Sequence, residues 1–477
     1  MCGIAAVYNP ANPIVRELYE LGMALQHRGE ESAGIAVSMD GDLFVYKDRG
    51  HVDDVFHGLG KASFNSYAGI VHTRYSTTGL SGRKNAQPIR VGKVALGHNG
   101  NLVNTDELRQ MFGERYDFDT TTDSELIACI FDEAPDMPTG AETASRLCKG
   151  SYNLVLLNNR GELGVFRDPS GNHPISVGFK GGALYAASED FAFQHLDLDG
   201  YREMEPGELI VFSKGMNSEA VVMEPPGIVI GRDLPKRICA FEGKYFMMPG
   251  STLNGKNVYE VRREVGRQLA KRFPVDADIV VPIPDSGIPY GLGYSEQSGI
   301  PFEPGGLIKN RYVRRTYTSP EGKDMDTPRI IQLTRRELSK LKLSATRYYV
   351  EGKRVVLTED SIVRGNVSPI TIQILRDAGA REVHMRIGFP PVRFPCFTGL
   401  DHAERRKLIA APFDDPIEAG DYVAKKIGAD SVRYIPQQTS REILSDSDNL
   451  CFACVDGDYW TEIPDTEQFR NALKIGV

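Results

Sequence analysis

The sequence begins Met1-Cys2-Gly3-Ile4, and the interpretation of the first half of the chain starts from this stretch. If Met1 is removed, Cys2 carries a thiol and a free α-amine on one residue. The thiolate is the attacking form of cysteine. An α-amine, with a pKa of about 8, can accept the thiol proton without help from a histidine. The alternative is a buried cysteine with no chemical role.

The composition of the 477 residues is that of an ordinary globular protein, with 41% hydrophobic and 25% charged residues. This length favours two or three domains. The net charge of −8 argues against a general nucleic-acid surface. No apolar run approaches the roughly 20 residues of a membrane span, and the first residues lack the pattern of a signal peptide. We therefore expect a cytoplasmic protein with no nucleic-acid or membrane partner.

The first 212 residues contain strand-like apolar runs, for example at 3–7, 68–72 and 152–157, and helical spacing at 15–26. Sheets packed on each other with helices outside fit this pattern. Each of the polar clusters that interrupt it is, taken alone, also typical of a turn. These clusters are residues 26–32, 72–77, 97–101 and 121–125.

Taken together with Cys2, the clusters supply what cleavage of an amide requires. Asn99 and the backbone N–H of Gly100 can stabilise the oxyanion of a tetrahedral intermediate. Arg74 can hold a carboxylate through two hydrogen bonds, and Asp123 can pair with an ammonium. A carboxylate, an ammonium and a cleavable amide on one small molecule describe glutamine.

These motifs, in this order and spacing, resemble the glutaminase domain of the class II, N-terminal-nucleophile glutamine amidotransferases. The resemblance implies Cys2 as the nucleophile, with Asn99 and Gly100 as the oxyanion site. It also implies that Arg28, Arg74 and Asp123 form the glutamine site, with Arg28 as a support beside the nucleophile. The implied fold is an α+β sandwich of antiparallel sheets flanked by helices.

The second half of the chain has a different pattern, in which helices alternate with apolar strands. A helical run at 258–272 leads into an apolar strand at 277–282. Further on, a strand at 354–358 is followed by a helix at about 368–378 and a strand at 383–387. Strand, helix and strand in this order predict a parallel sheet that binds ligands at the carboxyl ends of its strands.

Two loops of this sheet have residues suited to phosphates. Glu359 and Asp360 follow a strand and can bind ribose hydroxyls or a hydrated Mg²⁺. The turn at Gly365 precedes a helix N-terminus that can hold a phosphate, and the loop 284–287 can hold a pyrophosphate. Residues 309–354 contain 13 Lys and Arg against 5 Asp and Glu. This segment predicts contact with a polyanionic small molecule; a solvated basic face is the alternative.

The second half resembles a type I phosphoribosyltransferase domain, an α/β fold with a parallel sheet, and the whole chain resembles the glutamine phosphoribosylpyrophosphate amidotransferases. This implies that ammonia released at Cys2 displaces pyrophosphate from phosphoribosyl pyrophosphate, giving 5-phosphoribosylamine for purine synthesis. It also implies Mg²⁺ at Ser286, Glu359 and Asp360, and a mobile loop at about 312–343. The implied phosphoribosyl pyrophosphate ligands are Asp285, Ser286, Lys309, Arg311, Lys342, Glu359, Asp360, Arg364, Gly365 and Ser368.

Purine nucleotides as feedback inhibitors and a homotetramer follow from the resemblance alone. Glu359 stands where the family usually has an aspartate, and three further residues depart from the family pattern, namely Arg314, Asn366 and Val367. They leave open a related protein with a working glutaminase and a different acceptor, or a non-catalytic nucleotide-sensing regulator.

The remaining group of interest is Cys239, Cys396 and the closely spaced pair Cys451 and Cys454. These residues alone are compatible with zinc, a redox pair or no function. The resemblance implies a [4Fe–4S] cluster on the four thiolates, with structural Zn²⁺ as the alternative. The expected domains are a glutaminase at 2–230, a linker at 231–256, a transferase domain at 257–440 and a tail at 441–477.

Overall fold

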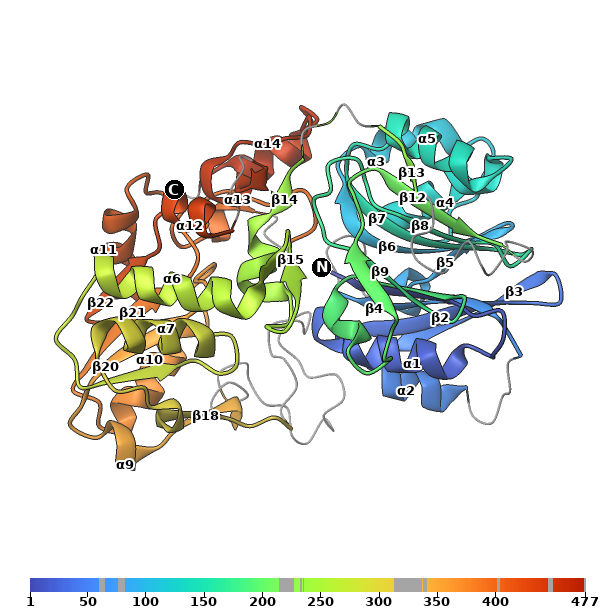
Figure 1. Cartoon of the computed structure of the whole chain (residues 1–477). Coiled ribbons are helices and arrows are strands. Elements are labelled where there is room, and N and C mark those ends of the chain that lie inside the picture. Colours follow the sequence, from blue (N-terminus) through green and yellow to red (C-terminus); the bar gives the residue numbers. More distant parts are fainter. Residues whose placement is uncertain are drawn as a thin grey trace.

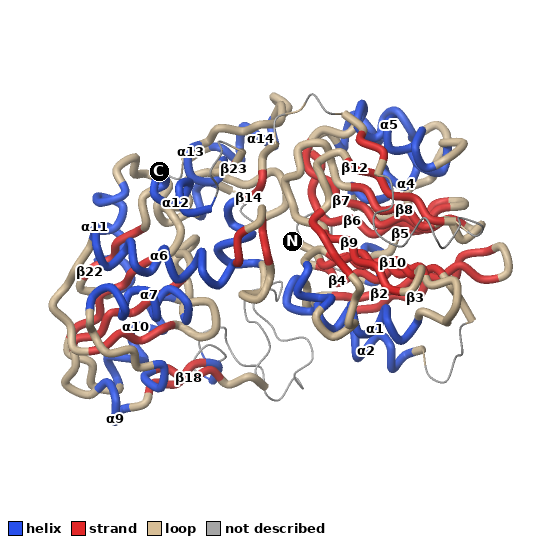
Figure 2. Tube along the Cα trace, viewed as in Figure 1, coloured by secondary structure: helices blue, strands red, loops and turns tan. Residues whose placement is uncertain are grey.

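The structure is a computed structural model of the chain. It describes residues 1–59, 65–75, 82–213, 227–231, 234, 236–312, 337, 341–400, 404–444 and 449–475. Figure 1 shows the two halves of the chain side by side, with the N-terminus at the junction between them. Figure 2 shows that strands dominate the first half and that helices and strands alternate in the second.

Two antiparallel sheets form the centre of the first half. One has the strand order β11-β9-β10-β1-β4-β2-β3, and the other the order β13-β12-β8-β7-β6-β5. The strands of the first sheet are β1 (Gly3–Tyr8), β2 (Ser32–Met39), β3 (Asp42–Arg49), β4 (Ala68–Arg74), β9 (Ser176–Lys180), β10 (Ala183–Ala187) and β11 (Gly200–Glu203). Those of the second are β5 (Ile89–Val91), β6 (Val94–Leu102), β7 (Gly150–Asn158), β8 (Leu163–Phe166), β12 (Glu208–Phe212) and β13 (Ile228–Val229).

The sheets pack face to face because successive strand residues point to opposite faces. Ile4 and Ala6 of β1 lie in one buried cluster with Val155 and Leu157 of β7. The outer face of the first sheet is covered by α1 (Val15–Ala24) and α2 (Val52–Gly58). The outer face of the second is covered by α3 (Thr105–Phe112), α4 (Asp123–Glu133) and α5 (Met137–Leu147). The predicted sandwich flanked by helices is confirmed.

The second half contains a parallel sheet with the order β17-β20-β21-β22. Its strands are β17 (Ile279–Pro282), β20 (Arg354–Glu359), β21 (Glu382–Ile387) and β22 (Ser431–Tyr434). Val356 of β20 packs against α6 (Val258–Arg272) and α7 (Ile288–Ser298). Val355 and Leu357 pack against the helices of the opposite face, α10 (Ser368–Asp377) and α11 (Pro416–Ile427). Helices on both faces confirm the predicted α/β fold.

Short elements join the halves. β14 (Ile238–Cys239) pairs in parallel with β23 (Leu450–Cys451), so the segment between the halves is tied to the C-terminal tail. A π-helix, η4 (Glu242–Phe246), follows β14, and α12 (Gln437–Leu444), α13 (Ala453–Asp456) and α14 (Glu467–Leu473) lie in the tail. The remaining elements are η1 (Gln26–Arg28), η2 (Arg83–Asn85), η3 (Asp190–Phe193), β15 (Thr252–Leu253), β16 (Lys256–Asn257), η5 (Pro304–Gly306), β18 (Leu307–Lys309), β19 (Leu343–Ala345), α9 (Arg347–Val350) and η8 (Arg405–Lys407).

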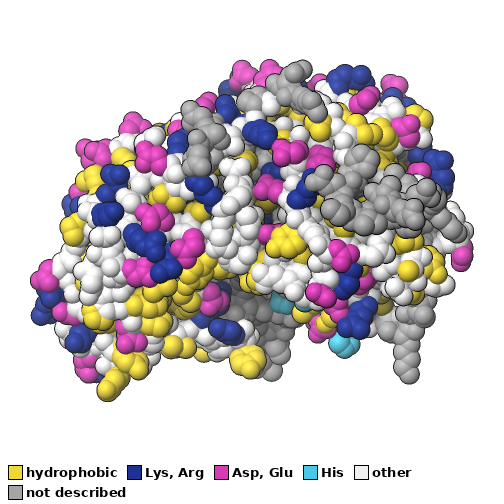
Figure 3. Space-filling model, viewed as in Figure 1, with side chains coloured by type: hydrophobic (Ala, Val, Ile, Leu, Met, Phe, Trp, Pro, Cys, Tyr) yellow, Lys and Arg dark blue, Asp and Glu magenta, His cyan; other side chains and the backbone are white. Residues whose placement is uncertain are grey.

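Each of the four polar clusters overlaps a regular element, where a turn was the alternative; residues 26–28 form η1 and 123–125 begin α4. The first residues of the 72–77 cluster end β4, and 97–101 lies inside β6. Within the described ranges, no helix is long and apolar enough to cross a membrane. On the face drawn in Figure 3, basic and acidic side chains are interspersed.

Candidate active site

The nucleophile predicted from the sequence lies where the two sheets of the first half meet. Cys2 precedes β1 of the first sheet, and Asn99 lies on β6 of the second. The backbone N of Cys2 donates to Oδ1 of Asn99 at 2.9 Å, and its Sγ lies 3.6 Å from the carbonyl of Tyr75. Cys2 is 7% exposed and Asn99 is fully buried. The structure therefore brings these two predicted residues into direct contact.

One side of the Asn99 amide remains available for a substrate. Its Nδ2 is buried and has no hydrogen-bond partner among the residues that the structure describes. A buried donor without an acceptor is costly, so it favours a ligand oxygen at this point. Gly100 follows, and a Cβ there would lie 2.1 Å from the Ser151 carbonyl. Only glycine fits at position 100 without displacing β7.

Met1 fills space beside the nucleophile. Its side chain is 2% exposed and packs in an apolar cluster with Phe241, Phe389 and Leu400. Burial lowers the pKa of its α-amine to about 6. Once Met1 is removed, the nitrogen of Cys2 becomes the terminal amine beside Asn99.

Arg74 and Asp123, the predicted holders of the glutamine carboxylate and amine, are both buried. Nη1 of Arg74 bonds Glu31 at 2.8 Å. Asp123 accepts from the backbone N–H of Leu102 at 2.9 Å and lies 3.7 Å from Nδ1 of His98. Burial opposes the charge of Asp123, but His98 and the Leu102 amide lower its pKa below the usual value. The structure therefore favours a charged carboxylate close to the Asn99–Gly100 strand.

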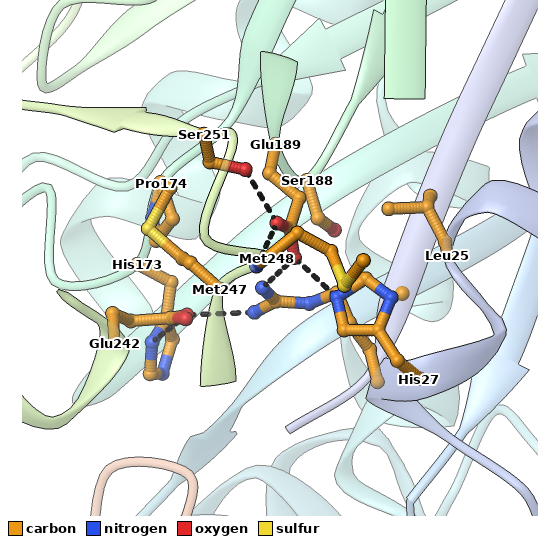
Figure 4. Close-up of polar contacts among 12 residues, drawn as sticks. Leu25, His27, His173, Pro174, Ser188, Glu189, Glu242, Met247, Met248 and Ser251 are labelled. Atoms are coloured by element: carbon orange, nitrogen blue, oxygen red, sulfur yellow. Dashed lines mark hydrogen bonds and ion pairs between the residues drawn. The ribbon is translucent and has the colours of Figure 1, made fainter. Parts of the chain in front are cut away.

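Arg28 lies behind the nucleophile and is fully buried. Its Nε donates to the carbonyl of Cys2 at 3.0 Å, while Nη1 bonds Glu189 and Nη2 bonds Glu242, both at 2.7 Å. Figure 4 shows Glu189 and Glu242 approaching a shared centre from two sides, with His27 and His173 beside them. With all these bonds made, Arg28 supports the Cys2 backbone, as expected of a residue beside the nucleophile.

Several of the predicted phosphoribosyl residues lie at the carboxyl ends of β17 and β20. Ser286 Oγ donates to Glu359 Oε1 at 2.9 Å, and Lys309 Nζ bonds Asp285 at 2.7 Å. Burial and then repulsion from Asp360 raise the pKa of Glu359 well above its usual value. A divalent cation would relieve this repulsion, so the donor set fits Mg²⁺.

The predicted turn at Gly365 and the helix that follows it are both present. Gly365 has φ +69°, and a Cβ there would lie 2.5 Å from Ile409. Ser368 begins α10, whose N-cap residue, Val367, makes no side-chain capping bond. Arg364 lies on this loop, half-buried. The helix N-terminus therefore has the form of an anion site.

The basic segment is described in part. Arg311 is exposed, and Lys342 is half-buried at a position where its carbonyl accepts from the N–H of Asn310 at 2.7 Å. Most of the predicted mobile loop at about 312–343, Arg314 included, lies outside the described residues.

The four cysteines of the linker, the second half and the tail lie close together. Cys239 and Cys451 are register partners on β14 and β23. Burial, and then Cys396, Cys239 and Cys451, raise the pKa of Cys454 well above its usual value. All four are free thiols. The soft donor set fits a cluster or zinc, although no three His, Cys, Asp or Glu side chains of the described chain are arranged as a metal site. The metal stays a prediction.

Several residues of the site could not be found from the sequence. Glu189 and Glu242 lie 161 and 214 residues from Arg28 along the chain, and neither belongs to the polar clusters. Glu31 does belong to one of these clusters, 26–32, and Arg74 belongs to another, 72–77. Their pairing could therefore have been suspected from the sequence. His173 belongs to none of the clusters, whereas His98 lies in the 97–101 cluster.

The fold and the site together define a class II glutamine amidotransferase with a phosphoribosyltransferase-type α/β half. Two family models agree: one for class-II glutamine amidotransferases matches residues 11–116, and one for a glutamine amidotransferase domain matches residues 72–195.

Relatives extend this over the whole chain. An amidophosphoribosyltransferase of Methanothermobacter thermautotrophicus is 39% identical, covering 97% of this chain and 95% of the relative. One of Synechococcus elongatus is 40% identical, covering 97% and 92%. A solved glutamine phosphoribosylpyrophosphate amidotransferase from B. subtilis, complexed with ADP and GMP, has a TM-score of 0.83 at 34% identity, covering 97% of this chain and 98% of its own. The chain belongs to the amidophosphoribosyltransferase family.

Proposed function

We propose that this protein is a glutamine-dependent amidophosphoribosyltransferase of purine biosynthesis. It hydrolyses glutamine to glutamate and transfers the ammonia to phosphoribosyl pyrophosphate, with release of pyrophosphate. The observation that carries the proposal concerns Asn99. Its Oδ1 accepts from the nitrogen of Cys2, while its buried Nδ2 has no hydrogen-bond partner among the described residues. Family membership over nearly the whole chain supports the acceptor, despite Asn366 and Val367 in the phosphate loop.

The first step takes place at Cys2. The α-amine freed by removal of Met1 accepts the thiol proton, and the thiolate attacks the side-chain amide carbon of glutamine. Nδ2 of Asn99 and the N–H of Gly100 stabilise the oxyanion. Ammonia leaves with the proton, and water then hydrolyses the thioester to glutamate. Arg74 binds the glutamine carboxylate and Asp123 binds its amine.

The second step takes place at the ends of β17 and β20. Ammonia attacks the anomeric carbon of phosphoribosyl pyrophosphate, and the bond to pyrophosphate breaks. Ser286, Glu359 and Asp360 would hold Mg²⁺, which would supply positive charge beside the pyrophosphate group. The loop from Gly365 to Ser368 binds the 5′-phosphate through the α10 N-terminus. The other proposed ligands are Asp285, Lys309, Arg311, Lys342 and Arg364.

The proposal also covers the cofactor and the partners. Cys239, Cys396, Cys451 and Cys454 hold a [4Fe–4S] cluster, which ties β14 to the tail; structural Zn²⁺ is the alternative. Since the B. subtilis enzyme was solved in complex with ADP and GMP, we propose purine nucleotides as inhibitors here. We also propose a homotetramer. Seven free thiols support a reducing cytoplasm as its location.

The division of labour is tested with Cys2→Ala. This variant should lose glutamine-dependent pyrophosphate release and keep ammonia-dependent release, because the acceptor site lies in the other half of the chain. Cys148→Ala, which replaces a buried thiol remote from Cys2 in the sequence, is the matched control. The proposal would be contradicted if Cys2→Ala lost both activities while Cys148→Ala kept them. Iron, sulfide and zinc analysis of anaerobically purified protein distinguishes the two metals.

A further inference from the structure

The support behind Cys2 is built from two carboxylates of different origin. Glu189 follows β10 in the glutaminase half, whereas Glu242 begins the π-helix of the linker. Both have fully buried side chains, and each bonds one arm of Arg28 at 2.7 Å. The third nitrogen of that guanidinium, Nε, donates to the Cys2 carbonyl.

We propose that Glu242 is a positioning residue for the glutaminase reaction, supplied to the nucleophile from outside the glutaminase fold. The inference deepens the proposed function and rests on it for the role of Cys2. Glu242 acts through Arg28 and does not touch substrate.

The geometry explains how a linker residue can position the nucleophile. Asn99 holds the nitrogen of Cys2 and Arg28 holds its carbonyl, so the backbone is fixed on both sides of the Cα that carries the thiol. A guanidinium that is bonded at all three nitrogens has one orientation. Without the charge of Glu242, Arg28 is pulled toward Glu189 alone, and the Cys2 carbonyl loses a fixed donor.

Contacts on both sides of the boundary hold Glu242 in place. Nδ1 of His173 lies 3.3 Å from Glu242 Oε1, and Nε2 of the same ring lies 2.8 Å from the carbonyl of Thr398, in the second half. In the opposite direction, Glu189 accepts from Ser251 Oγ and the Met248 N–H of the linker, both at 2.7 Å (Figure 4). The nucleophile, the linker and the second half are thus joined by buried polar contacts.

Glu242→Gln is a suitable test because it keeps the shape of the side chain. Oε1 can still accept from Arg28, and the new NH₂ replaces Oε2, a buried acceptor with no hydrogen-bond partner among the described residues. Glu242→Asp keeps the charge and serves as the conservative variant. Glu208→Gln is the matched control. Glu208 is a buried carboxylate on β12 that pairs with Arg202 at 2.6 Å and makes no contact with Arg28.

We expect Glu242→Gln to lower the kcat of glutamine hydrolysis about 10- to 100-fold, as a small displacement of a reacting group does. The KM for glutamine should change less than about threefold, because Arg74 and Asp123 are untouched. Glu242→Asp should retain more activity than Glu242→Gln, and Glu208→Gln should stay within about twofold of wild type. Ammonia-dependent pyrophosphate release should stay within about twofold in all three variants.

The rate at which Cys2 is alkylated by a diazoketone analogue of glutamine, followed by mass spectrometry, gives a second readout that needs no transferase activity. It should fall in parallel with kcat. If wild-type protein releases no pyrophosphate, the proposed acceptor is wrong, and this alkylation rate still tests Glu242. An unchanged kcat in Glu242→Gln, or an equal loss of the glutamine and ammonia activities, would overturn the proposal.

Discussion

At the scale of single residues, the site is defined by which polar atoms are already bonded and which are not. Arg28 and Asp123 make their bonds within the protein, which fixes their positions. Nδ2 of Asn99 is buried and has no such bond to another described residue. A protein tolerates a buried donor of this kind where a bound ligand supplies the hydrogen-bond acceptor. The oxyanion of a tetrahedral intermediate is such an acceptor.

The first prediction concerns Gly100. An alanine Cβ would lie 2.1 Å from the Ser151 carbonyl and 2.8 Å from Nε2 of His98, so Gly100→Ala must displace the strand that carries Asn99. Loss of one oxyanion donor typically costs 10²- to 10³-fold in kcat. We expect a loss of about this size in glutamine hydrolysis, with ammonia-dependent transfer retained. Gly41→Ala, at φ +81° with nothing within 4 Å of the added Cβ, is the control.

The second prediction concerns His72, whose pKa burial lowers to about 3. Between this value and the usual value of about 6.5, the unfolded chain binds a proton that the folded chain does not, so stability falls as the pH falls below 6.5. At pH 5.5 this costs about 1.4 kcal/mol. Urea unfolding at pH 7.5 and 5.5 should show a smaller loss for His72→Gln than for wild type. The exposed His57→Gln should show the wild-type loss; equal losses in all three would contradict the assignment.

At the scale of elements, strands and helices with a clear period were predictable and long-range pairings were not. The spacing at 258–272 predicts the helix that the structure contains, Val258–Arg272, because apolar residues recur at helical spacing. The motif at 97–101 gave no such signal. Its glycines and asparagines are typical of turns, yet they lie inside β6, where β7 supplies the partners. Glu242 was missed for the same reason, since its partner is 214 residues away.

The third prediction concerns the loop that precedes α10. Gly365 and Gly352 both have positive φ, but a Cβ at Gly365 would meet Ile409 at 2.5 Å whereas one at Gly352 meets nothing within 4 Å. Both alanine variants lose about 1 kcal/mol through the backbone conformation. Only Gly365→Ala should also raise the KM for phosphoribosyl pyrophosphate, by about tenfold, because its loop binds the 5′-phosphate. Steady-state kinetics with ammonia as the nitrogen donor measures this, and equal KM values in the two variants would argue against the loop.

At the scale of the whole molecule, the linker is in contact with both the glutaminase half and the C-terminal tail. The linker element η4 reaches the nucleophile through Glu242, and β14 reaches the tail through its pairing with β23. The sequence resemblance predicted two catalytic halves. It could not show how the halves touch, because these contacts join residues that are far apart along the chain and belong to no motif.

The central claim is that glutamine hydrolysis in one half supplies ammonia to phosphoribosyl pyrophosphate in the other. The most direct test is pyrophosphate release by anaerobically purified protein given Mg²⁺, phosphoribosyl pyrophosphate and glutamine. We expect release that requires both substrates, with one glutamate formed for each pyrophosphate. Glutamate formed without pyrophosphate would contradict the claim and leave a glutaminase with a different acceptor.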